Sequence, residues 1–385
     1  MKTRSLVTAS TLLFLSSLIF CREKVLQVKV SNPSRFARQN EMISLRWSEI
    51  LKELPSLGSK DIVVIDTRTK GKVLSQSNGD DLLFQTNFAA KETKSFVIKY
   101  GSNGDTKPQS RVDGRFVEPR QDYAWENDRI AFRMYGPALA AEVNNGIDVW
   151  TKRVRYLIVE KWYKGEEDTG KSKVSYHIDH GEGADFFSVG KSLGAGGSGI
   201  WYNNRVYQPG VFSSQRTICN GPLRVTFELT YNTWLVEGKQ LIETKRISLD
   251  AGQHLNRIEV TFTSPIPGDT ILIACGLVKR KNTLLSRGNN NPWIGLWGQT
   301  AEDSVNGSLG TGVVLLKSTF IGMNEDKDQH LIIGRAKVGE TFTYYAGAGW
   351  TRSGDFAGSD EWNAYLESYC QRLQQPLRIK LAVQK

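Results

Sequence analysis

The stretch from Tyr176 to Asp185, YHIDHGEGAD, carries the densest group of ionisable side chains in the sequence. It holds two of the four histidines, His177 and His180, between a tyrosine and a glycine-containing bend with carboxylates. A histidine titrates near neutral pH, so it can take up or release a proton in catalysis when a carboxylate orients its ring. The composition of this stretch therefore predicts general acid–base chemistry.

Two other interpretations of the same stretch stay open. Imidazole and carboxylate groups also suit zinc or manganese, although this spacing matches no fixed metal motif. The ligands would then be His177, Asp179, His180 and Glu182. The histidines can instead be structural, at the end of a strand over residues 174–180 that places His177 and His180 on opposite faces. Acid–base chemistry requires no cofactor, and a divalent metal stays an alternative.

A glycine-rich segment, Gly190 to Gly199, follows directly and reads GKSLGAGGSG. Its lysine and serine precede the glycines, the reverse of a nucleotide-binding loop, so nucleotide binding is disfavoured. We expect a flexible loop that lets a substrate approach closely, with Lys191 in contact with it. Trp201 and Tyr202 come next, and their rings suit the apolar faces of sugars, although packing in a β-core is the ordinary use of such residues.

Two arginines in the run Trp125 to Pro137, WENDRIAFRMYGP, share one face if the run is a strand. These are Arg129 and Arg133. A guanidinium group binds a carboxylate or a sulfate through two parallel hydrogen bonds, so this face is a candidate site for an anionic sugar. Surface salt bridges are the competing interpretation.

The first part of the chain, residues 22–115, shows short strand patterns separated by polar turns, with a helical stretch near residues 48–54. Residues 101–122 are rich in Gly, Ser, Pro and charged side chains, which is typical of a domain junction. The sequence therefore predicts a small N-terminal β-module that ends near residue 115.

The second part, residues 116–385, contains many strand-like segments, among them 153–162 and 199–206. One strongly periodic helix is expected from Ser359 or Asp360 to Leu373, with an aromatic stripe that packs in the core, and a last strand over 377–383. Many antiparallel strands with few helices predict an all-β fold, a large antiparallel β-sandwich.

Residues 1–21 have the composition of an export signal, with Lys2 and Arg4 before an uncharged apolar run. The run is too short and too rich in Ser and Thr to span a membrane, and no second candidate follows. Cys21 ends it and is a candidate lipid-anchor site, although Phe20 stands where a small residue is usual. We expect an exported protein, in the periplasm or as an outer-membrane lipoprotein.

Net charge points to the class of partner. The chain carries 50 basic and 40 acidic residues, and removal of residues 1–21 takes away two basic side chains and leaves +8. A positive excess on an exported protein favours anionic partners, among which nucleic acid is disfavoured by export. The remaining cysteines, Cys219, Cys275 and Cys370, allow at most one disulfide and show no zinc or redox spacing, so we interpret them as buried thiols.

Four long motifs resemble a family of exported bacterial proteins long catalogued as a domain of unknown function and found in polysaccharide-utilisation gene clusters. They are WENDRIAFRMYGP (125–137), GIDVWTKR (146–153), YHIDHGEGADFFSVGKSLGAGGSGIW (176–201) and ETKRISLDAGQHLN (243–256). Some members are similar to the oligosaccharide dehydratase of ulvan breakdown. The last motif also resembles the supersandwich of galactose mutarotases, which implies that fold for residues 116–385.

The resemblance implies a carbon–oxygen lyase that removes water from a terminal uronic acid of an anionic, ulvan-type oligosaccharide and leaves an unsaturated sugar. Such a β-elimination needs a base for the C5 proton, an acid for the leaving hydroxyl and a cation for the sugar carboxylate. The candidates are His177 or His180 as base, Tyr176 or Tyr202 as acid, and Arg133 or Arg129 as carboxylate clamp.

Two other functions stay open from the sequence. A non-catalytic protein that binds anionic polysaccharide would need the arginines and aromatic residues but not the histidines. A sugar mutarotase or epimerase would need acid and base groups but would form no new double bond. A glycoside hydrolase is disfavoured because the sequence shows no clear spaced carboxylate pair.

Overall fold

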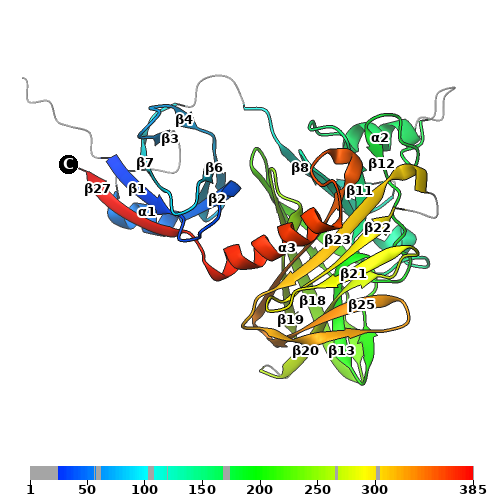
Figure 1. The fold of residues 1–385 in the computed structure, drawn as a ribbon. Coiled ribbons are helices and arrows are strands. Elements are labelled where there is room, and N and C mark those ends of the chain that lie inside the picture. Colours follow the sequence, from blue (N-terminus) through cyan, green and yellow to red (C-terminus); the bar gives the residue numbers. More distant parts are fainter. Residues whose placement is uncertain are drawn as a thin grey trace, which may run out of the picture.

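The computed structural model describes residues 25–55, 57, 62–102, 108–118, 120–167, 174–264, 268–300 and 304–384. The fold is all-β, as predicted: antiparallel sheets form a small body near the N-terminus and a large sandwich, with the last helix between them (Figure 1). The predicted export signal, with Cys21, lies outside the described residues. Within the described ranges, no helix is both long and apolar enough to cross a bilayer.

The small body consists of two sheets that enclose their own apolar core. One sheet has the strand order β27-β1-β7-β3-β4 and the other the order β2-β6-β5. Alternate side chains of β1, among them Leu26 and Val28, are buried against Phe84 and Phe96. The bounds are β1 Val25–Ser31, β2 Arg38–Arg46, α1 Trp47–Glu53, β3 Ile62–Asp66, β4 Lys72–Val73, β5 Ser75–Asn78, β6 Asp81–Phe88, β7 Thr93–Tyr100 and β27 Arg378–Gln384.

The small body includes the last strand of the chain. β27 pairs antiparallel with β1 from Val25 opposite Gln384 to Ser31 opposite Arg378. The sequence predicts a strand here but gives no sign of its partner, because nothing in an alternating pattern identifies the edge to which it adds. The boundary near residue 115 falls within β8, whose pairing with β9 assigns it to the sandwich.

A nine-stranded antiparallel sheet, called here the large sheet, is the centre of the sandwich. Its order is β15-β16-β18-β19-β26-β23-β22-β21, and β17 pairs with β18. The bounds are β15 Ser214–Asn220, β16 Arg224–Thr230, β17 Trp234–Val236, β18 Lys239–Asp250, β19 Leu255–Thr263, β21 Thr283–Arg287, β22 Trp293–Gln299, β23 Ser308–Leu315 and β26 Thr341–Trp350.

Two five-stranded sheets pack on the inner face of the large sheet, with orders β12-β11-β10-β9-β8 and β14-β13-β20-β25-β24. All three sheets contribute to one core, in which Trp125, Phe227 and Ile273 are buried. The bounds are β8 Val112–Val117, β9 Asp122–Asn127, β10 Ala131–Met134, β11 Asp148–Lys152, β12 Gly183–Ala184, β13 Ala195–Tyr202, β14 Arg205–Tyr207, β20 Thr270–Val278, β24 Phe320–Glu325 and β25 Gln329–Lys337; short 3₁₀ turns span Pro137–Leu139, Ser304–Asn306 and Thr351–Ser353.

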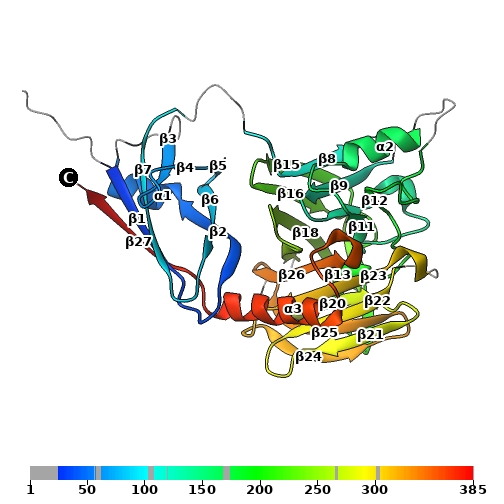
Figure 2. The ribbon, with the colours of Figure 1, turned by 45° about the horizontal axis from the view of Figure 1, so that its top comes forward.

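The predicted terminal helix is confirmed as α3, Ser359–Gln374. It buries Trp362, Leu366 and Cys370, four residues apart, on the outer face of the large sheet, and its aromatic residues pack in that core as expected. Trp362 lies against Gly310 of β23, where a Cβ atom would be 2.8 Å from the indole ring. The view of Figure 2 shows α3 running from the sandwich toward β27.

Three local predictions are wrong. Residues 153–162 are not a strand: the chain leaves β11 at Lys152 and enters helix α2, Val159–Glu167. The buried Glu126 carboxylate accepts hydrogen bonds from the backbone N–H groups of Ile158 and Val159, both at 2.7 Å, and so satisfies donors at the start of that helix. Residues 174–180 form turns and bends, so the two-face assignment of the histidines does not apply.

The glycine-rich segment is the third correction. Residues 195–200 form the buried part of β13, not an exposed loop. Gly196 has a φ of +113°, and a Cβ atom there would overlap the Cβ of Ala346 in β26. The glycines therefore permit close packing of β13 on the large sheet, rather than access for a substrate.

Candidate functional site

A buried arginine, Arg133 of β10, lies among three carboxylates from neighbouring elements. Its guanidinium is 2.7 Å from Asp148 of β11, 3.0 Å from Asp185 after β12 and 3.7 Å from Asp122 of β9. All four side chains are nearly inaccessible to solvent. Because β9, β10 and β11 are adjacent strands, their register brings these distant residues to one place.

Burial, with a smaller contribution from neighbouring carboxylates, raises the pKa of Asp122 and Asp185 in this cluster, called here the Arg133 cluster. Burial raises the pKa of Asp122 to about 6, although the positive charge of Arg133 opposes the increase. Burial, and then the charge of Asp148, raise the pKa of Asp185 well above its usual range. Burial alone would lower the pKa of Arg133, but Asp148 and its neighbours raise it above the ordinary value, so the guanidinium stays charged.

Two tyrosines complete the cluster. Arg133 donates hydrogen bonds to the hydroxyl of Tyr176 at 3.2 Å and to that of Tyr135 at 3.3 Å. Burial raises the pKa of both phenols, so both hold their protons at neutral pH. Tyr176 also stacks on Trp150, with ring centroids 4.7 Å apart, which fixes the plane of its ring.

His177 lies at the surface of the Arg133 cluster with 55% of its side chain exposed. Its Nδ1 atom is 3.2 Å from the backbone carbonyl oxygen of Asp185 and 3.6 Å from the carboxylate of the same residue. A carbonyl oxygen only accepts, so Nδ1 of the neutral ring donates and Nε2 is the basic nitrogen. His177 is therefore a solvent-accessible base held by a buried polar network.

His180 has different surroundings. It lines a cavity of about 400 Å³ between α2 and the bend, together with Tyr176, Trp162, Ile178 and Glu182. Lys161 binds both oxygens of Glu182 at 2.7 Å, and Tyr156 donates a hydrogen bond to the same carboxylate. The structure thus separates the two histidines, and only His177 contacts the Arg133 cluster.

Asp179, between the histidines, anchors the bend and brings two exposed arginines together. Its carboxylate accepts hydrogen bonds from the backbone N–H groups of Gly181 and Gly183 at 2.8 and 3.0 Å. Arg153 and Arg352 each lie 3.5 Å from its other oxygen. About a third of each arginine side chain is exposed, so both are open to solvent in part. The sequence did not indicate Arg352, because 173 positions separate it from Asp179 and no pattern joins them.

The structure does not group the four candidate metal ligands, His177, Asp179, His180 and Glu182, around one point. In the part of the chain that the structure describes, no three or more His, Cys, Asp or Glu side chains are grouped to hold a metal ion. Asp179 turns toward arginines and Glu182 toward Lys161, so neither carboxylate joins the two imidazoles.

The remaining predicted site residues lie elsewhere. Arg129 binds Asp355 at 2.5 Å, and that carboxylate also meets Arg155 at 2.7 Å and His254 at 3.4 Å. Although burial alone would raise the pKa of Asp355, hydrogen bonds from His254 and Arg155 hold it well below its usual range. Arg129 thus belongs to a structural ion-pair group.

The aromatic pair is also distant from the histidines. Trp201 and Tyr202 form the end of β13 that pairs with β14, whereas the beginning of the strand, at Ala195, adjoins Ile147. Six residues of a strand span roughly 20 Å. Trp201 packs on the apolar cluster of β20 and β25, and Tyr202 is exposed. Lys191 is exposed in the turn before β13, and its carbonyl accepts a hydrogen bond from Asn144.

Comparisons with known proteins identify the family but give no activity for it. The family described as "Domain of unknown function (DUF4861)" matches residues 30–379. "Uncharacterized protein P7" of Formosa agariphila is 31% identical over 378 residues, which cover 92% of this chain and 93% of the relative.

Two solved structures from Enterococcus faecalis are similar at low identity. A protein in the glycosyl hydrolase family 38 has a TM-score of 0.47 at 10% identity, and an alpha-mannosidase has a TM-score of 0.42 at 8%. The alignments cover 94% of this chain and 47% and 46% of those chains, so the protein spans about half their length. The family match over most of the sequence, together with a relative of nearly equal extent, shows that this chain belongs to the DUF4861 family.

Proposed function

We propose that the protein is a carbohydrate-active lyase of the dehydratase type, which removes water from a terminal uronic acid of an anionic, ulvan-type oligosaccharide. The observation that carries the proposal is the setting of His177. Its Nδ1 atom is fixed by Asp185 above the Arg133 cluster, and the ring is half-exposed. This is the arrangement of a general base whose orientation is maintained by a second group.

The sugar carboxylate needs a cationic partner, because the C5 proton beside an ionised carboxylate is only weakly acidic. Arg133 is enclosed by Asp148 and Asp185, so we assign this role to Arg153 and Arg352. Both arginines contact Asp179, two residues from His177, and both are partly exposed. A guanidinium fork can hold a carboxylate through two hydrogen bonds and stabilise the negative charge that develops as the proton leaves.

The elimination then needs one base and one acid. Nε2 of His177 takes the C5 proton, the electrons of that C–H bond form the C4–C5 double bond, and the C4–O bond breaks. We assign Tyr176 as the acid that protonates the leaving hydroxyl, so that water is released. Tyr176 adjoins His177, and burial raises its pKa, so the phenol is protonated before the reaction. The tyrosine is buried and lines the cavity beside α2, so the leaving oxygen must reach the phenol from that cavity.

The proposal is tested by incubating the protein with a panel of oligosaccharides that end in glucuronate or iduronate. We expect new ultraviolet absorbance from an unsaturated uronate and a product lighter than the substrate by one water molecule. Binding without a product would contradict the proposal and favour a polysaccharide-binding protein. A product of unchanged mass would contradict it and favour a mutarotase or an epimerase.

Export is part of the same proposal. A protein that acts on polysaccharide fragments must meet them outside the cytoplasm, which agrees with the signal-like composition of residues 1–21. N-terminal sequencing of the protein from a membrane or periplasmic fraction tests it, and an intact Met1 on cytoplasmic protein would contradict it.

A further inference from the structure

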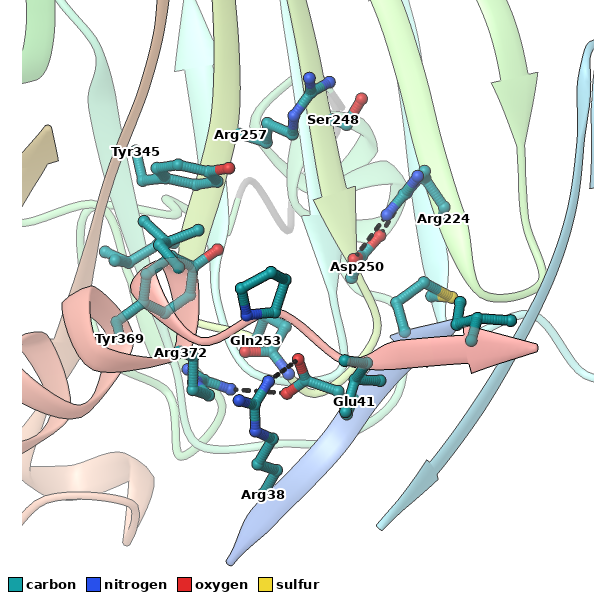
Figure 3. Close-up of a pocket in the computed structure, with 16 residues that line it drawn as sticks. Arg38, Glu41, Arg224, Ser248, Asp250, Gln253, Arg257, Tyr345, Tyr369 and Arg372 are labelled. Carbon is teal, nitrogen blue, oxygen red and sulfur yellow. Dashed lines mark hydrogen bonds and ion pairs between the residues drawn. The ribbon is translucent and has the colours of Figure 1, made fainter. Parts of the chain in front are cut away.

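A second polar cavity, lined by neither His177 nor His180, lies where the small body meets the sandwich (Figure 3). Its volume is about 290 Å³. The walls come from β2, from the outer face of β16, β18, β19 and β26, and from the C-terminal part of α3 with the segment that leads to β27. None of its lining residues lines the cavity beside His180.

Arginines dominate the walls of this cavity, which we call the interface cavity. Four of them line it, Arg38, Arg224, Arg257 and Arg372, against two lining carboxylates, Glu41 and Asp250. Glu41 is shared between two arginines, at 3.1 Å from Arg38 and 3.3 Å from Arg372. Asp250 takes two hydrogen bonds from Arg224, at 2.5 and 2.9 Å.

The fourth arginine, Arg257, pairs with a carboxylate that does not line the interface cavity. Arg257 binds Glu259, which does not line the interface cavity, and 42% of the Arg257 side chain is exposed. Four guanidinium groups therefore meet three carboxylates in all, and the excess charge is positive.

The guanidinium groups also have unused donors. The Nε atoms of Arg38 and Arg372 are buried and have no hydrogen-bond partner among the described residues. These two N–H groups are closed to solvent, so a ligand would meet the outer nitrogens of the lining arginines instead. Arg257 offers the most, because its side chain is the most exposed of the four. Carboxylate and sulfate oxygens are the acceptors that match a guanidinium best.

An aromatic wall gives the interface cavity a second kind of surface. The rings of Tyr345 and Tyr369 lie 5.1 Å apart, and the guanidinium of Arg372 stands 4.6 Å from the centre of the Tyr369 ring. Leu373 and Pro376 continue the apolar part. Burial raises the pKa of both phenols, so they are neutral hydrogen-bonding groups. Such a wall suits the C–H face and the hydroxyl groups of a sugar ring.

We propose that the interface cavity binds one saccharide unit that carries a carboxylate or a sulfate, at a site separate from His177. A volume near the lower end of the range for small-molecule sites fits a single unit rather than a chain. The ligand would lie between β2 of the small body and Arg257 of the large sheet, so its binding would join the two bodies. This inference does not rest on the proposed lyase activity, because it uses none of the residues assigned to that reaction.

The first test is calorimetric titration of the whole protein with four probes: glucuronate, glucose 6-sulfate, glucose and inorganic sulfate. We expect one or both charged sugars to bind at least about tenfold more tightly than glucose or free sulfate, because only they use both the arginines and the tyrosine wall. Equal affinity for glucose or for inorganic sulfate would overturn the proposal, as would no binding of either charged sugar at millimolar concentration.

The second test assigns the binding to this cavity by means of matched variants. Arg257→Ala should weaken binding of the charged sugar about tenfold, because it removes a donor group from the wall. Arg246→Ala is the control: Arg246 is also half-exposed, also faces outward and is also paired with a glutamate, Glu228, but it does not line this cavity. Equal losses in the two variants would overturn the proposal.

A third variant separates this inference from the proposed function. Arg153→Ala, at the candidate active site, should leave intact the binding event that Arg257→Ala weakens, although it lowers any lyase activity. If Arg153→Ala abolishes binding and Arg257→Ala does not, the sugar binds near His177 and the proposal for the interface cavity fails. If Arg257→Ala folds poorly, Tyr345→Phe is a second substitution in the lining of the interface cavity. It too should weaken binding of the charged sugars.

Discussion

The Arg133 cluster and the interface cavity are built from the same two groups in opposite proportions. Around Arg133, one guanidinium meets three carboxylates that are almost wholly buried. Four guanidinium groups but only two carboxylates line the interface cavity, and a third carboxylate, Glu259, pairs with Arg257 outside it. The buried carboxylates of the Arg133 cluster orient the ring of His177, whereas a surplus of arginines leaves donors for an anion from outside. The two sites use the same residue types. The ratio of arginines to carboxylates and the burial of these groups distinguish the proposed site of proton transfer from the proposed site of anion recognition.

The largest effect should come from removing the single cation of the Arg133 cluster. Arg133→Met leaves Asp148 and Asp185 buried without their partner, and we expect a loss of about 3–5 kcal/mol in the free energy of unfolding. Urea denaturation measures it. Arg129→Met is the control, because Asp355 keeps Arg155 and His254. A loss at Arg129 as large as that at Arg133 would show that the surplus of carboxylates is not what makes Arg133 critical.

The two histidines give the next largest expected difference. His177→Ala should lower the turnover of a uronate-terminated oligosaccharide by about 10²-fold or more, the usual effect of removing a general acid or base. His180→Ala should retain most of the activity, because its ring faces the α2 cavity and not Asp185. The rate of double-bond formation, followed by absorbance, measures both. Full activity in His177→Ala would exclude it as the base.

Raised proton affinity in the Arg133 cluster should appear as a pH-dependent stability. The pKa of Asp122 is about 6 in the folded protein, above its value in an unfolded chain, so the folded state binds more protons between about pH 4 and pH 6. Stability from this group is therefore full at low pH and is lost as pH rises through about 6. Asp122→Asn should gain on the order of 2 kcal/mol relative to the parent protein between pH 4 and pH 7.5. Thermal unfolding at the two pH values tests this, and an unchanged difference would contradict it.

The smallest effect is expected at the junction beside the interface cavity. Gln76 of the small body accepts hydrogen bonds from the backbone N–H groups of Leu223 and Arg224, at 2.7 and 2.8 Å, and donates one to the carbonyl of Arg224. Gln76→Ala should cost about 1–2 kcal/mol, because it leaves these backbone groups unpaired. Hydrogen exchange at residues 223–224 should become faster, while exchange near Arg133 should not change. Unchanged exchange at 223–224 would mean that Gln76 does not hold the junction.

The sequence predicts the class of fold well because local signals determine it. The helix over residues 359–374 follows from Trp362, Leu366 and Cys370 at helical spacing, and the strands follow from alternation. The prediction of a strand over residues 153–162 is wrong because alternating charged and apolar residues also fit an amphipathic helix. There, a tertiary contact from Glu126 decides the outcome.

The candidate site was predictable in part. His177 stands out in the sequence, yet the choice of Asp185 among the nearby carboxylates becomes clear only when the bend at residues 180–182 brings its carbonyl to the ring. The sequence singles out Arg133 by its residue type, but its role depends on Asp122 and Asp148, which the strand register brings beside it. Arg352 and the whole interface cavity depend on contacts between segments far apart in the chain, which no local pattern encodes.

The pairing of β27 with β1 has a consequence for the order in which the protein is completed. The paired residues are roughly 350 positions apart, so at ordinary rates of synthesis the two strands become available on the order of tens of seconds apart. During that interval β1 presents an unpaired edge, the kind of edge to which other strands can add. Leu381 and Val383 must also arrive before the core of the small body is covered. The small body therefore contains the first strand to be synthesised and cannot be complete until the last strand has been synthesised.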